Sequence, residues 1–183
     1  DIAETQMADG ARALEYLRQA LEFDHFSREV TTKLREVATK HRLWTALLRV
    51  HEERFGYAEA AERVELQIEI ATEAAEVAET KVSDAPDAFR WASRGYFVAI
   101  AHELPASDLL ERLDRLAQSY GLWSDLVGVI EREIEHYDER GAVHSGTYDA
   151  VARYLDASTI AEDHLEDPQR AVGFLQRAHR LRP

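Results

Sequence analysis

The sequence has no cysteine, one methionine and only four prolines among its 183 residues. The absence of cysteine excludes disulfides, thiol nucleophiles and thiolate-ligated metal sites. The eight glycines form neither a Gly-x-Gly-x2-Gly fingerprint nor a Walker A loop, so no phosphate-binding loop is predicted. There is no run near the ~20 apolar residues that a transmembrane helix needs, and no signal peptide is recognisable.

Positive charge is also scarce. Lys and Arg number 22 against 35 Asp and Glu, which gives a formal net charge of −13 at pH 7. A chain this acidic lacks the basic surface that binds nucleic-acid phosphates or anionic lipid, so we expect neither nucleic acid nor membrane among its partners. The compartment stays open, with the cytoplasm favoured. Because the chain begins at Asp1 rather than Met, we expect it to be a fragment of a longer protein.

Apolar residues recur at i, i+3, i+4 and i+7 along the whole chain and hardly ever alternate, which predicts an all-α protein. Ser27 and Thr147 are predicted N-caps, Gly56 a predicted C-terminal cap, and Pro86 and Pro168 mark first helical turns. About nine helices with short links follow. They are expected at 2–23, from 27, 43–56, 58–82, 87–104, 107–121, 122–140, 147–164 and from 167 to the end, with the 58–82 helix the longest.

An internal repeat connects these helices. Leu34, Ala38, Leu43, Trp44, Leu47 and Val50 recur, at a constant offset of 79 in residue number, as Leu113, Ala117, Leu122, Trp123, Leu126 and Val129. A second block, which includes Ala78, Asp84 and Ala88, recurs at an offset of 83. The excess of the second offset over the first falls where a loop is expected, at 141–146. Because a helix pair cannot bury its apolar face alone, we predict that stacked pairs share one core and that residues 1–183 form a single helical-repeat domain.

The junctions between helix pairs resemble the tetratricopeptide repeat (TPR). The resemblance rests on Asp84-x3-Ala88-x3-Ala92-x2-Gly95, on Asp167-x3-Ala171-x3-Leu175-x2-Ala178-x4-Pro183 and on Ala13-x3-Leu17-x2-Ala20-Leu21. It covers the turn and second helix of each repeat, whose small residues let neighbouring helices approach closely. The Leu-Trp-x2-Leu helices are similar to those of divergent bacterial TPR arrays. The resemblance implies a right-handed α-solenoid of antiparallel helices that binds a protein or peptide partner.

Trp44 and Trp123 are candidates for stacking on a ligand. Both follow a leucine and occupy the same place in the repeat. A bulky residue that recurs in this way is typical of packing between helices. We therefore predict near-core positions for both and no binding role.

Metal and catalytic motifs give no site. Glu133 and His136 have the Glu-x-x-His spacing of di-iron bundles, but the second such pair, Glu22 and His25, falls at a helix end. The other histidines form no His-x3-His pair and no zinc motif; they are His41, His51, His102, His144, His164 and His179. Ser145 lacks the Gly-x-Ser-x-Gly elbow of a nucleophile. No catalytic residue, metal site or cofactor is predicted.

The acidic run from Glu59 to Glu79 is expected to be a solvated helix face. The alternative is that its glutamates attract a basic peptide.

The sequence thus predicts a non-catalytic interaction scaffold or adaptor of TPR-like type, whose protein partner and binding residues it does not identify. One alternative is a middle slice of a longer solenoid with no ligand of its own. It is favoured by the apolar residues expected on display along the last helix, which could also support self-association. They are Ala171, Val172, Phe174, Leu175, Ala178 and Leu181. A carboxylate or di-iron bundle enzyme is the other alternative.

Overall fold

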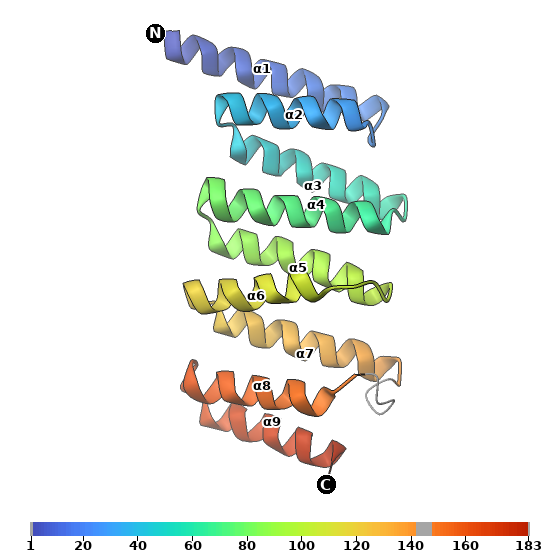
Figure 1. Ribbon diagram of the computed structural model, residues 1–183, viewed down its shortest axis with the longest axis vertical. Helices are drawn as coiled ribbons and strands as arrows, with labels where there is room; N and C mark the ends of the chain where they lie inside the picture. Colours follow the sequence, from blue (N-terminus) through green and yellow to red (C-terminus); the bar gives the residue numbers. More distant parts are fainter. Residues whose placement is uncertain (1, 142–147, 183) are drawn as a thin grey trace. The chain divides into compact units, whose positions relative to one another are not determined.

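The computed structural model describes residues 2–141 and 148–182, with side chains from Asp9 onward. In this part of the chain every regular element is helical, so the predicted all-α class and nine helices are confirmed (Figure 1). The elements are α1 (Ile2–Phe23), α2 (Arg28–His41), α3 (Trp44–Ala60), α4 (Val64–Val77), the π-helical turn η1 (Ala78–Val82), α5 (Ala85–Ala101), α6 (Ser107–Tyr120), α7 (Trp123–Glu139), α8 (Ala150–Asp163) and α9 (Pro168–Leu181). None of these helices is long and apolar enough to cross a membrane.

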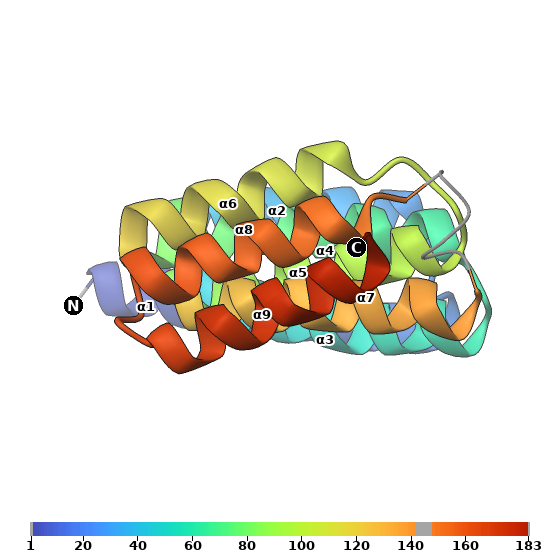
Figure 2. The same cartoon turned by 90° about the horizontal axis from the view of Figure 1, so that it is seen from below.

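The chain divides into two compact units, Asp1–Leu109 and Leu110–Pro183. In the first unit α1 packs against α2, α3 against α4, and α4 against α5. Within that unit α2 lies on the opposite side from α1 and α3 when viewed from below (Figure 2). In the second unit α7 packs against α8, and α8 against α9. Consecutive helices therefore supply most of the packing inside each unit.

The sequence repeat is also a repeat of local structure. Helices α6 and α7 begin and end at the same offset of 79 from the bounds of α2 and α3. Equivalent apolar positions are buried to the same degree: Leu34 and Leu113 are both at most 1% exposed, and Leu47 and Leu126 are both 3% exposed. The two copies therefore share helix boundaries and core positions.

The core of the first unit gathers leucines and valines from four helices. Its buried members are Leu14, Leu21, Leu34, Ala38, Leu47, Val50 and Val77. Further along the unit, α4 and α5 approach closely through small residues. A Cβ atom added to Gly95 would lie 3.0 Å from the Cβ of Ala71. A larger residue at position 95 would require Ala71 or Leu109 to shift, in line with the small residues expected along the second helices.

Side-chain caps mark the starts of α2, α5, α8 and α9. Ser27, Asp84 and Asp167 accept hydrogen bonds from backbone N–H groups in the first turns of α2, α5 and α9, at 3.4, 3.0 and 2.9 Å. Such bonds satisfy N–H groups that have no partner within the helix. Asp149 caps α8 in the same way, at 3.1 Å from the nitrogen of Ala152. The prediction of Thr147 as the cap of this helix is wrong, because α8 begins later, at Ala150; Thr147 itself lies outside the described residues.

The predicted end of the third helix and the predicted start of the fourth are wrong. Helix α3 runs through Gly56 to Ala60, and the predicted 58–82 helix is in fact the end of α3, then α4 and η1. The turn comes at Glu62, which has φ +52°, and the Arg63 N–H donates to the carbonyl of Ala58 at 2.8 Å. The longest helix is α1, with 22 residues. A left-handed glutamate carries no sequence signal, whereas Gly141, its equivalent in the second copy, has φ +67°.

Two glycine substitutions test these boundaries. Gly56 is exposed inside α3 with no atom within 4 Å of an added Cβ, so Gly56→Ala should stabilise the protein by about 0.5–1 kcal/mol. Gly121 has φ +72°, so Gly121→Ala should destabilise it by about 1 kcal/mol. Urea unfolding measures both changes. If Gly56→Ala lowers the free energy of unfolding instead, the prediction that Gly56 ends the helix would be supported against the observed course of α3.

Candidate binding pockets

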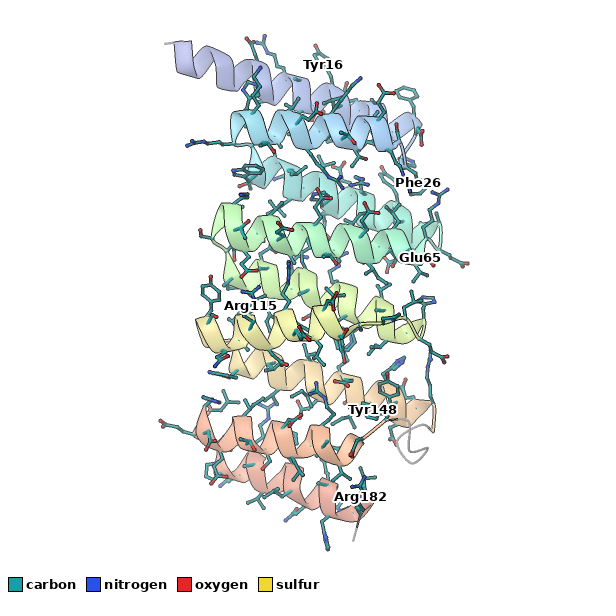
Figure 3. The ribbon with its side chains drawn as sticks, in the orientation of Figure 1. Tyr16, Phe26, Glu65, Arg115, Tyr148 and Arg182 are labelled. Carbon is teal, nitrogen blue, oxygen red and sulfur yellow. The ribbon has the colours of Figure 1, made fainter. Side chains whose placement is uncertain are left out.

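The first unit contains a pocket of about 670 Å³ between α2, α3 and the start of α4. We call it the arginine pocket, because four arginines contribute to its lining. Its lining residues are Phe26, Arg28, Thr31, Thr32, Arg35, Arg54, Glu62, Arg63, Glu65, Leu66 and Glu69. Phe26 and Glu65 lie at the same end of the unit, where the α1–α2 loop comes near the start of α4 (Figure 3).

Arg54 is the buried charge of this pocket. The residue is only 5% exposed, and its Nε and Nη1 atoms make no hydrogen bond to any described residue. Burial lowers the pKa of Arg54, and the nearby positive charge of Arg35 lowers it further, whereas Glu73 and Glu69 oppose the shift. An arginine stays protonated at pH 7 even so, because the ordinary pKa of a guanidinium lies far above neutral. The pocket therefore holds a cation that makes no hydrogen bond or salt bridge to the described residues.

Arg35 is neutralised by another helix. Its Nε and Nη2 donate to both carboxylate oxygens of Glu73 on α4, and Glu69 lies 3.7 Å from Nη2. The hydrogen bonds to Glu73 are the first cause of the raised pKa of Arg35. This bidentate pair ties α2 to α4 across the wall of the pocket. Glu73 is consequently occupied and does not hydrogen-bond Arg54.

His51 lies one helical turn before Arg54 and is 1% exposed. Desolvation, and then the charges of Arg54 and Arg35, lower its pKa to about 3. The Glu73 carboxylate lies 3.7 Å from Nε2, too far for a hydrogen bond, and does not offset the burial. His51 is therefore neutral at pH 7, and neither ring nitrogen has a hydrogen-bond partner among the described residues.

The second unit has a smaller pocket of about 380 Å³, which we call the tryptophan pocket. It is lined by Asp114, Gln118, Trp123, Leu126, Ile130, Arg153, Asp156, Thr159, Ile160 and His164. The rings of Trp123 and His164 stack at 3.8 Å with an interplanar angle of 6°. Burial raises the pKa of Asp114, and the positive charge of Arg153 opposes that shift.

Trp44 and Trp123, both predicted to be near-core, are half-buried. Trp44 packs against the core of the first unit and has the Lys81 ammonium 5.9 Å above its ring. Lys81 and His164 are equivalent at the repeat offset of 83, so each tryptophan ring contacts a basic residue from the same position of the repeat. Trp123 differs in that it also lines a pocket, a role that the sequence did not indicate.

The Glu-x-x-His residues are engaged in other interactions. Glu133 is 5% exposed and accepts hydrogen bonds from Nε and Nη2 of Arg153 at 3.0 and 2.8 Å. The His25 ring stacks on Tyr57 at 3.7 Å, and Glu22 is exposed beside Arg18. Among the described residues no three Asp, Glu or His side chains are grouped to hold a metal ion. His144 and Ser145 lie outside those residues.

The acidic run, 59–79, is divided between the end of α3, α4 and η1. Glu59, Glu62, Glu65, Glu69 and Glu76 are exposed, as predicted for a solvated face. Three of these line the rim of the arginine pocket. Glu73 departs from the prediction, because it is half-buried and paired with Arg35.

Sequence reasoning missed Arg54. The signal was present, since Leu47, Val50, Arg54 and Ala58 follow the helical spacing i, i+3, i+7 and i+11, and all four are buried. An arginine in an apolar stripe is a sign of a buried charge. The charged residues that act on Arg54 come from α2 and α4, and no spacing within α3 indicates them.

No protein-family model matches the chain. No curated protein matches it either. Among solved structures it is similar to "BtubC (BKLC) from P. vanneervenii", with 12% identity, a TM-score of 0.48, and coverage of 100% of this chain and 91% of that one.

The neutral His51 predicts a loss of stability in acid. The unfolded chain takes up the proton near pH 6.5 and the folded chain only near 3, so stability falls as pH drops through that range. Between about pH 7.5 and 4.5 this costs about 2–3 kcal/mol. The variant His51→Ile copies Ile130 at the equivalent position. Its free energy of unfolding should fall by about 2–3 kcal/mol less than that of the wild type over this pH range. The exposed His179→Ile is the control, and equal pH dependence of both variants would refute buried neutral His51.

Proposed function

We propose that the chain is a non-catalytic protein-binding module, in which helix pairs stack as a right-handed, TPR-like solenoid. The observation that carries this proposal is the arginine pocket, an open site of about 670 Å³ lined from three helices. Pockets of a few hundred Å³ between helices hold ligand groups or side chains of a partner. Its lining combines charged groups with the apolar Phe26 and Leu66, which suits a peptide segment.

The rigidity of the lining supports this proposal. The Arg63 guanidinium lies 4.0 Å above the ring of Phe26, and the Arg35–Glu73 pair connects α2 to α4. A wall held by such contacts loses little conformational freedom when a partner binds. Binding a peptide requires no reactive group, so the module needs no catalytic residue.

A peptide-display selection tests the proposal. A random peptide library is panned against the chain, and enriched peptides are measured by calorimetry. Leu66→Trp fills the pocket and should reduce their affinity by about tenfold or more. Leu155→Trp is the matched control, because Leu155 is 46% exposed in the other unit. The proposal fails if nothing is enriched, or if both variants bind equally well.

A structural slice of a longer solenoid is the second candidate function. Val172 and Leu175, one turn apart on α9, are 51% and 45% exposed. The prediction that the whole apolar set of the last helix is on display is wrong for Ala171, Phe174 and Ala178, which are at most 5% exposed. They are buried because α9 packs against α8.

Light scattering over a range of concentrations tests this second candidate. If α9 is an interface, the chain should self-associate, and Leu175→Glu should shift it toward the monomer. Leu155→Glu is the control, because Leu155 is equally exposed on α8. A wild-type chain that is monomeric at all concentrations would argue against α9 as an interface between copies.

A further inference from the structure

The unpaired guanidinium of Arg54 is the starting observation. Its Nε and Nη1 are buried without a hydrogen-bond partner among the described residues, and the residue lines an open pocket. A buried charge without a counter-charge is costly, and proteins normally pair it. Arg54 therefore requires an explanation that core packing does not give.

The glutamates near Arg54 do not meet this need. Glu73 gives both of its oxygens to Arg35. Glu69 is exposed, and its carboxylate forms a salt bridge with Arg35, at 3.7 Å from Nη2. Glu62 and Glu65 are exposed at the rim of the pocket. Water screens the charges of these rim glutamates more than it screens a charge at the buried floor.

The second copy of the repeat shows how the chain meets a buried charge by itself. The position equivalent to Arg54, at the offset of 79, is Glu133, which is also buried. Arg153 on α8 pairs with it at 2.8 Å. At the offset of 83, the residue equivalent to Arg153 is Ile70, which is 1% exposed. The first copy thus has a positive charge, Arg54, where the second has the negative Glu133. It also has the apolar Ile70 where the second has the partner, Arg153.

We propose that the arginine pocket binds a carboxylate of a peptide partner, which takes the place that Arg153 fills for Glu133 and pairs with Arg54. This inference rests on the proposed function and adds the chemistry of the partner. A carboxylate matches the planar guanidinium, whereas a phosphate dianion meets stronger repulsion from Glu62, Glu65 and Glu69. The Phe26 and Leu66 side chains contact the apolar neighbours of that carboxylate.

NMR of the Arg54 Nε–H group tests the site directly. The probes are the peptide acetyl-Ala-Ala-Glu-Ala-Ala-amide, its glutamine counterpart, sodium acetate and inorganic phosphate. The glutamate peptide should shift the Arg54 signal saturably, and at least about tenfold more tightly than the glutamine peptide does. Equal affinity for the two peptides would overturn the proposal. If acetate binds as tightly as the glutamate peptide, the proposal that the carboxylate belongs to a peptide is overturned. If phosphate binds more tightly, the proposal that the pocket selects a carboxylate is overturned.

A pair of variants separates binding from folding. Arg54→Met should abolish the response to the glutamate peptide, while Arg49→Met, an exposed arginine of the same helix, should keep it when followed by the backbone signals of α3. Without ligand, Arg54→Met should also raise the melting temperature, because it removes an unpaired buried charge. A lower melting temperature would mean that Arg54 is already paired within the chain, and would overturn the proposal.

These outcomes distinguish this inference from the proposed function. If the display selection yields peptides that lack acidic residues and bind Arg54→Met normally, the module binds peptides but the carboxylate site is refuted. If the selection yields nothing while acetate still shifts the Arg54 signal, the proposed function fails and the peptide source of the carboxylate fails with it.

Discussion

Each helix of this chain must bury its apolar stripe against a neighbouring helix, and the rest of the structure depends on that constraint. Apart from α1, the helices are short, such as the 14 residues of α2 and the 17 residues of α3, and such lengths are marginal for a helix alone in water. Packing of consecutive helices provides the missing stability. In the first unit, leucines and valines from α1, α2, α3 and α4 form one core, and small residues let α4 and α5 come into close contact.

The same constraint decides where the two copies of the repeat are free to differ. Their apolar positions coincide, since Leu34, Leu47 and Val50 are buried like their equivalents in the second copy. Polar substitutions within the shared stripe then give each unit its own chemistry. His51 and Arg54 replace Ile130 and Glu133, so the first unit has a buried cation where the second has a paired carboxylate. A shared packing plan with different buried charges allows related helix pairs to offer different pockets.

The buried polar side chains at the proposed binding site lower the stability of the fold. An unpaired Arg54 and a neutral His51 both oppose folding, and neither has a hydrogen-bond partner among the described residues. Binding of an anionic group would recover part of the cost at Arg54, so affinity and stability are linked at this position. The Arg35–Glu73 pair engages both oxygens of the carboxylate that most opposes the lowered pKa of Arg54.

The sequence by itself determined the all-α class, the repeat offset and the helix starts at Ser27 and Asp167, because periodicity and capping act within a few residues of the chain. It did not locate the turn at Glu62, since packing on both sides can hold a non-glycine residue in a left-handed conformation. It also did not reveal the arginine pocket. Whether Arg54 is paired depends on which side chains of α2 and α4 reach it, and residues distant in sequence meet only in the tertiary structure.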